Sequence, residues 1–322
     1  MAQLIKLQDY VSRYAQDIYL YPSRYVRLKK KQWEGWKEKW EHGSDQPIDF
    51  MKESSPPLPE SFIEKIKSRI RLHGSGVEAE MIPEGQRHSE EQEILFGSGA
   101  FDSLHSIHTE EGLKQHFLDN LLPFQLKWAS STLTERSFLA KDFLHDPTLK
   151  FLLQRFPDTF LVLYKPIFLL KKAPVEAELV LITPVAAMCI SFMEAEEDAA
   201  FIGSKDRFWI KKTRNTETKI LNPLIPLNRT EKIVKALFDL YEVDLPVQKL
   251  LLSRNGYFDY PLPPYGVQFI DKRDFADWFI VQRGMKSPLK HIQLKAAQVL
   301  LQFCQTTSVR RLEWENQPGD GE

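Results

Sequence analysis

The feature that most constrains the fold of this chain is an apolar stretch of 17 residues, 177–193, which Thr183-Pro184 divides in two. Proline interrupts a helix and holds the residue before it in an extended conformation. Each half is short and rich in β-branched and small residues, and the whole is shorter than the about 20 residues that a membrane-spanning helix needs. The stretch therefore predicts two buried strands joined by a turn at residues 183–186.

The turn also predicts the register of the two strands. Counting outward from it places Glu178 opposite Ser191 and Glu176 opposite Met193. Because side chains alternate along a strand, these four residues are expected on one face of the sheet.

The rest of the chain divides into helical and extended patterns. Strands are expected at residues 160–170, 177–182, 187–193, 199–202 and 207–212, as a sheet of four or five strands, and again at 247–252 and 267–270. Helices are expected at 7–19, 23–40, 60–72, 109–121, 134–156 with a break at Asp146-Pro147, 230–241, 271–282 and 287–306.

These elements predict an α/β (α+β) fold with a central mixed sheet and helical N- and C-terminal extensions. The expected divisions are an N-terminal helical appendage (1–45), a linker with a short helix and an acidic loop at 73–93 (46–107), an α/β core (108–245), a mainly helical extension (246–314) and a tail (315–322).

Composition narrows the function classes. The 43 Lys and Arg balance 44 Asp and Glu to a net charge of −1, which argues against a protein that grips nucleic acid over its whole surface but allows a local basic patch. Cys189 and Cys304 are far apart and form no CxxC pair, which favours a reducing compartment, and the first 25 residues lack the pattern of a signal peptide. We expect a cytoplasmic protein without membrane insertion.

Further landmarks follow the two apolar strands. Gly203 precedes a strand, RFWIKK, that contains Trp209, and Asn222-Pro223-Leu224 leads into the helix expected from Thr230. In this order the chain resembles the nuclease-related domain (NERD) family, a branch of the restriction-endonuclease-like fold. The resemblance covers residues 134–241, about a third of the chain, and implies a nuclease-like central sheet.

The catalytic residues of that family do not carry over. The resemblance places the family's Asp on Glu178, its Glu on Ser191 and its Lys on Met193. Metal-assisted hydrolysis needs several carboxylate oxygens around Mg²⁺ and a group that assists the attacking water, and Ser and Met supply neither. Glu176 and Glu178 are the weak metal candidates. Nearby acids offer little compensation, since Glu194 and Glu196 are expected on the opposite face and Glu197 about 20 Å away.

Three functional hypotheses result. The first is a non-catalytic, NERD-like binding or scaffold module that needs no cofactor and contacts nucleic acid or another protein. The second is a divergent Mg²⁺-dependent nuclease that uses Glu176 and Glu178. The third is a protein-interaction module that docks through aromatic N-terminal helices. The occupants of the motif positions favour the first.

A basic cluster surrounds the strand with Trp209. Its members are Lys205, Arg207, Lys211, Lys212, Arg214 and Lys219. They either contact a nucleic-acid backbone or protect an edge strand from aggregation, and the second interpretation is favoured.

The helix expected at 23–40 combines basic and aromatic residues. Trp33, Trp36 and Trp40 follow the spacing of a stripe that packs on other helices, while Lys and Arg cover the other side. Packing is favoured over binding of phosphate or a membrane. His105, His108 and His116 lack the spacing of a zinc site.

Overall fold

The computed structural model describes residues 1–42, 107–170, 173–194 and 198–311. The helix expected at 60–72 and the acidic loop at 73–93 lie outside the described residues. Residues 1–29 and 118–322 form one compact unit, and residues 30–117 form a second. None of the helices in the described part of the chain combines the length and the apolar content that crossing a membrane requires.

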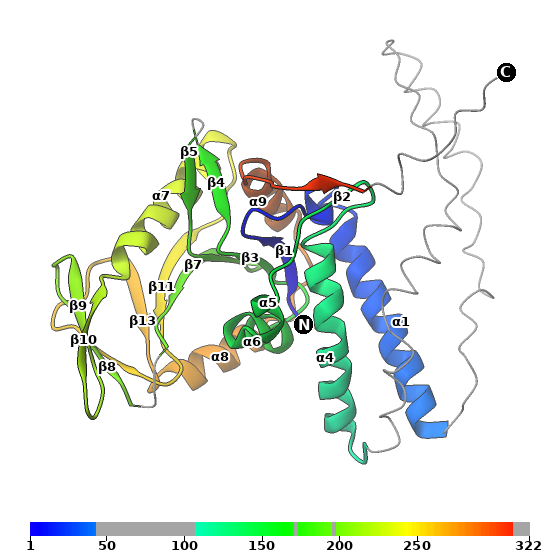
Figure 1. Ribbon diagram of the computed structural model, residues 1–322, viewed down its shortest axis with the longest axis horizontal. Coiled ribbons are helices and arrows are strands. Elements are labelled where there is room, and N and C mark those ends of the chain that lie inside the picture. Colours follow the sequence, from blue (N-terminus) through cyan, green and yellow to red (C-terminus); the bar gives the residue numbers. More distant parts are fainter. Residues whose placement is uncertain (43–106, 171–172, 195–197, 312–322) are drawn as a thin grey trace, which may run out of the picture. The chain divides into compact units, whose positions relative to one another are not determined.

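A six-stranded mixed sheet forms the centre of the first unit (Figure 1). Its strands, in spatial order, are β1 (Gln3–Leu7), β3 (Leu161–Tyr164), β6 (Leu179–Ile182), β7 (Ala187–Phe192), β11 (Val247–Leu252) and β13 (Val267–Ile270). Strand β6 is antiparallel to both of its neighbours, β3 and β7, whereas β1 is parallel to β3, and β11 is parallel to both β7 and β13. The predicted α/β class with a central mixed sheet is confirmed.

Helices cover this sheet because its central strands are apolar on both faces. Every residue of β3 and β6 is buried, the pattern of strands that are covered from two sides. The helices of this region are α5 (Asp142–His145), α6 (Pro147–Arg155), α7 (Leu224–Leu240), α8 (Phe275–Arg283) and α9 (His291–Gln302). Helix α7 contacts β7 and β11, α9 contacts β6 and α7, and α6 contacts β3.

The N-terminal residues correct one prediction. The expected helix at 7–19 is wrong, because Gln3–Leu7 form strand β1, buried at every position, and only a 3-10 turn at Arg13–Ala15 follows. A lysine at position 6 is unexpected in a fully buried strand. Its side chain is nevertheless buried, and Nζ donates to the carbonyl oxygens of Tyr10 (2.6 Å) and Gln305 (2.8 Å). Residues 1–29 therefore belong to the sheet unit and are not a separate helical appendage.

The predicted strand at 160–170 is two strands. Lys165, with φ of 47°, and Pro166 break it after β3, and β4 (Ile167–Leu170) then forms a hairpin with β5 (Ala173–Glu176). A positive φ and a proline both end a regular strand.

The strands expected at 199–202 and 207–212 are present, but not in the central sheet where they were predicted. They belong to a second sheet of four strands, ordered β10 (Glu217–Leu221), β9 (Phe208–Lys212), β8 (Ala200–Ile202) and β12 (Tyr257–Asp259). Strand β9 lies between β10 and β8, so the interpretation of its lysines as protection of an edge strand is wrong: β10 is the edge.

The C-terminal region is more than a helical extension. It supplies β11 and β13 to the central sheet, while β14 (Val309–Arg310) pairs with β2 (Glu135–Arg136). The parallel pairing of β7 with β11 requires a crossover, which α7 provides.

The aromatic stripe of α1 (Tyr21–His42) packs as predicted. Within the second unit, the rings of Trp33 and Trp36 lie 5.4 and 5.5 Å from the ring of Phe117 in α4 (Glu110–Trp128). The indole nitrogen of Trp40 donates to the carbonyl oxygen of Ile107 at 2.7 Å. Trp36 is 2% exposed, so this residue is part of a helix–helix core.

Candidate functional site

The β6–β7 hairpin has the predicted register. Ile182 pairs with Ala187 and Leu179 with Ile190 across an antiparallel ladder. The Thr183 hydroxyl holds the turn, because it accepts from the backbone N–H of Ala186 at 3.0 Å and donates to the carbonyl oxygen of the same residue at 2.9 Å.

Glu178 lies one residue before β6, opposite Ser191 of β7. The Ser191 hydroxyl donates a hydrogen bond to the Glu178 carboxyl group. Burial nevertheless raises the pKa of Glu178, since this hydrogen bond and the positive charges of Lys165 and Arg229 offset only part of the desolvation. The pair of facing residues predicted from the sequence is therefore present, and burial disfavours the charged form of the Glu178 carboxyl group.

Helix α7 fixes the backbone of Glu178 through a hydrogen bond. The backbone N–H of Glu178 donates to the Thr230 hydroxyl at 2.8 Å, and that hydroxyl donates to the carbonyl oxygen of Pro226 at 2.9 Å. Thr230 is fully buried in the middle of α7 rather than at its predicted start. The helix begins at Leu224, whose N–H the Asn222 side chain accepts at 3.0 Å.

Glu176 does not share this arrangement. It ends β5, is exposed and pairs with Ile167, so its expected position opposite Met193 is wrong. The N–H of Ala177 donates to the carbonyl oxygen of Pro166, which separates β5 from β6. Met193 is half-buried beyond the end of β7, and its backbone N–H donates to Leu252.

Other acids near this end of the sheet already have structural partners. Glu194 forms a two-point ion pair with Arg254, whose guanidinium lies 4.5 Å from the centre of the Phe151 ring. Asp146 accepts from the first turn of α6 and from the Tyr164 hydroxyl at 2.6 Å. Sequence reasoning did not identify Tyr164 and Arg254 as partners of these acids, since only the fold brings them together.

The chemistry available at this end of the sheet is limited. In the described ranges, no group of three or more His, Cys, Asp and Glu side chains is placed to hold a metal ion. One half-buried carboxyl group beside a hydroxyl does not provide the ligands that Mg²⁺ requires for hydrolysis.

The residues that carried the sequence resemblance converge on the loop before β9. The indole nitrogen of Trp209 donates to the carbonyl oxygen of Ser204 at 2.9 Å, and the Asn222 amide donates to Asp206 at 2.8 Å. A Cβ on Gly203 would lie 2.2 Å from the ring of Tyr260. These residues shape the scaffold and bring no reactive group to Glu178.

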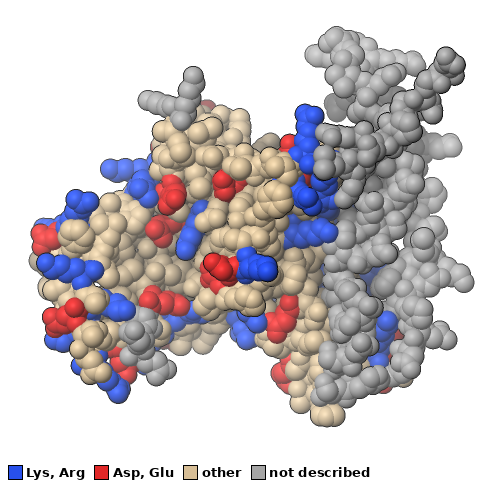
Figure 2. All heavy atoms as spheres, viewed as in Figure 1, with Lys and Arg blue, Asp and Glu red and all other residues tan. Residues whose placement is uncertain are grey.

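The basic cluster lies on the β9–β10 hairpin and the loop before it. Lys212 pairs with Glu217 at 2.9 Å, and Arg214 lies 3.7 Å from Asp198. Three other cations, Lys205, Arg207 and Lys219, are exposed and form no ion pair with any described residue. Figure 2 shows Lys and Arg at the end of the molecule that β9 and β10 form, with acidic residues among them.

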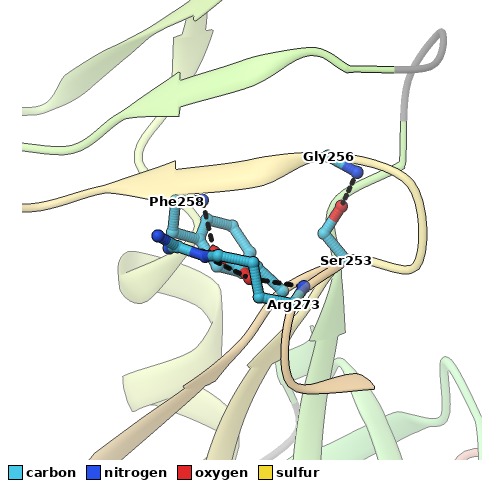
Figure 3. A network of polar contacts seen from close by, with 5 residues as sticks. Ser253, Gly256, Phe258 and Arg273 are labelled. Atoms are coloured by element: carbon cyan, nitrogen blue, oxygen red, sulfur yellow. Dashed lines mark hydrogen bonds and ion pairs between the residues drawn. The ribbon is translucent and has the colours of Figure 1, made fainter. Parts of the chain in front are cut away.

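A polar network fastens the other edge of the second sheet (Figure 3). Asp271, 3% exposed, accepts from the backbone N–H of Phe258 in β12 and from the Arg273 side chain. The Ser253 hydroxyl accepts from the N–H of Gly256 at 3.0 Å. The Arg273 guanidinium and the backbone N–H groups of Arg273 and Phe258 hold the pKa of Asp271 low in spite of its burial.

The histidines offer no alternative centre among the described residues. The ring of His116 packs 5.5 Å from that of Trp36, and His291 lies 5.6 Å from the ring of Tyr19. His105 lies outside the described residues.

Comparison with known proteins adds one similarity. The chain is 32% identical over 125 residues to an RNA 2',3'-cyclic phosphodiesterase of Geobacillus stearothermophilus, a match that covers 39% of this chain and 36% of that protein. The chain thus spans about a third of the length of the relative that it matches. No protein-family model and no solved structure matches the chain.

Proposed function

We propose that the chain is a non-catalytic binding module built on a NERD-like core. The observation that carries this proposal is the pairing of Glu178 with Ser191 at the end of the β6–β7 hairpin, where the family's nuclease motif places two carboxylates. The order of hairpin, Gly203, Trp209 and Asn222 before α7 supports the likeness in layout. Fold likeness alone does not establish activity, so the proposal depends on the site residues.

RNA is the proposed partner. Residues 205–221 contain six Lys and Arg and two acidic residues, a surplus of four positive charges in a chain whose net charge is −1. Such a local patch attracts the phosphate backbone of a nucleic acid. The name of the phosphodiesterase relative favours RNA over DNA. We place this function in the cytoplasm, since both cysteines are free thiols, as is usual in a reducing compartment.

Incubation of the purified protein with Mg²⁺ or Mn²⁺ and single- and double-stranded RNA and DNA tests the proposal. We expect binding that weakens with salt and no cleavage. Cleavage that disappears in Glu178→Ala would show a divergent nuclease and overturn the proposal.

A reconstitution experiment sharpens this test. The double variant Ser191→Glu, Met193→Lys restores the charged residues of the NERD motif: the Glu opposite Glu178 and the Lys two residues further along the chain. We expect this variant to bind Mn²⁺ by calorimetry where the natural chain does not, with Ser191→Gln, Met193→Leu as the uncharged control. Equal Mn²⁺ binding by the natural chain and the restored variant would contradict the loss of the metal site.

A further inference from the structure

The second sheet has one buried face and one apolar face that is exposed. Trp209 and Phe201 are each 1% exposed on the inner face. On the outer face, Phe208 is 50%, Ile210 37% and Leu221 51% exposed. The outward face of such a sheet is normally polar, so three large apolar side chains there need an explanation.

The ladder places these three side chains together. Phe208 of β9 pairs directly with Leu221 of β10, and Ile210 follows two residues along the same face. Ile202 of β8 pairs with Ile210 and continues the apolar row. We call Phe208, Ile210 and Leu221 the outer patch.

Two cations adjoin the outer patch, and the one acid on this face of the hairpin, Glu217, is paired with Lys212. Lys219 pairs with Ile210 across the ladder, and the Arg207 guanidinium lies 5.6 Å from the centre of the Phe208 ring. Neither cation has an ion-pair partner among the described residues. The hairpin thus combines an accessible aromatic ring with cations that remain available to phosphate groups.

We propose that the outer patch is a platform for single-stranded RNA, on which a base stacks against Phe208 while Lys205, Arg207 and Lys219 contact the backbone. Proteins that bind single strands combine aromatic stacking with a basic surface in this way. In a duplex the bases are already stacked and paired, so an apolar sheet face adds little to the attraction of phosphates. The inference rests on the proposed function and specifies its strand preference and its contact surface.

Fluorescence anisotropy with a labelled single-stranded RNA of about 12 nucleotides, and with the same sequence as a duplex, measures this preference. Stacking by one aromatic residue changes affinity by about 5- to 150-fold on alanine substitution. We expect Phe208→Ala to weaken single-strand binding within this range and to leave duplex binding nearly unchanged. Phe208→Tyr keeps the ring and should keep the affinity.

The chain supplies a matched control for Phe208. Phe138 is 72% exposed, and the Arg136 guanidinium lies 5.4 Å from its ring centre, but it lies outside the hairpin. Phe138→Ala should bind both RNAs as the natural chain does. The triple variant Lys205→Gln, Arg207→Gln, Lys219→Gln should weaken binding and reduce its salt dependence.

The outcomes separate the inference from the function. If the natural chain binds neither RNA, the proposed RNA function and the platform are both overturned. If it binds RNA but Phe208→Ala behaves like Phe138→Ala, the function stands and the platform is overturned. A preference for the single strand that Phe208→Ala removes and Phe208→Tyr preserves supports the platform.

Discussion

A single position, Glu178, shows how this site differs from a metal centre. A carboxylate that binds Mg²⁺ has to be ionised and accompanied by further anionic oxygens. Here burial raises the pKa of Glu178, and its partner across the hairpin is the Ser191 hydroxyl. The residue is therefore suited to hold the ends of β6 and β7 together through a hydrogen bond.

The raised pKa of Glu178 predicts that the stability of the native state depends on pH. The native state holds the Glu178 proton more tightly than the unfolded state, whose pKa is near 4.5, so the free energy of unfolding falls as the pH rises from 4.5 through the native pKa. Glu178→Gln removes the titrating group and so abolishes this fall in the free energy of unfolding. Urea unfolding across this window should show the stability of the natural chain declining relative to the variant.

The exposed Glu176 provides the control, because Glu176→Gln changes a carboxyl group outside the β6–β7 ladder. Its pH profile should follow that of the natural chain. Parallel profiles for the natural chain and Glu178→Gln would mean that burial does not penalise the Glu178 charge.

At the scale of elements, the four-stranded sheet depends on close packing at the loop before β9. The Trp209 ring lies 5.5 Å from that of Tyr260 and stacks 6.4 Å from that of Phe269 in β13. This contact joins the second sheet to the central one. The apolar residues of β9 are thereby divided between a core and an exposed face.

Gly203→Ala tests this packing. A Cβ would lie 2.2 Å from the Tyr260 ring and 3.1 Å from the Trp209 ring, so both side chains must move. We expect a loss of about 1–3 kcal/mol in the free energy of unfolding, the usual cost of overpacking, measured by urea denaturation.

Gly284→Ala is the matched control, because the nearest atom to its Cβ is a backbone oxygen at 3.3 Å. A change within about 1 kcal/mol is expected there. An equal effect of the two substitutions would argue against tight packing at Gly203.

For the whole molecule, the decisive contacts join the two ends of the described chain. The amine of Lys6 in β1 donates to residues near the C-terminus, and the N–H of Thr307 donates to the carbonyl oxygen of Asp9 at 2.8 Å. The N–H of Gln305 also donates to Ile167 at 2.7 Å. The first and last described segments therefore stabilise each other.

Lys6→Met should weaken this connection. Methionine retains the apolar length but leaves the partly buried carbonyl oxygens of Tyr10 and Gln305 without their donor. Loss of a donor to such acceptors costs about 1–3 kcal/mol, so thermal and urea unfolding should show destabilisation in this range. Lys232→Met, an exposed substitution on α7, should change stability by no more than about 0.5 kcal/mol. Equal stability of the two variants would contradict the structural role of Lys6.

The amino-acid sequence by itself determined the features whose causes are local. Thr183-Pro184 set the turn and thus the register that pairs Ile182 with Ala187, and Asp146-Pro147 set the start of α6. The position of Glu178 opposite Ser191 likewise follows from this local register.

Only the tertiary structure decided the features that depend on distant partners. Gln3–Leu7 form a strand because β3, more than 150 residues away, offers a parallel ladder, and burial of Lys6 depends on carbonyl groups near the C-terminus. The second sheet that residues 199–221 form takes its fourth strand, β12, from a distant part of the chain, and packing of Trp209 on Phe269 buries the inner face and leaves Phe208 on the outer one. Hydrogen bonding and burial across the fold supply the free energy here, and short-range patterns do not encode them.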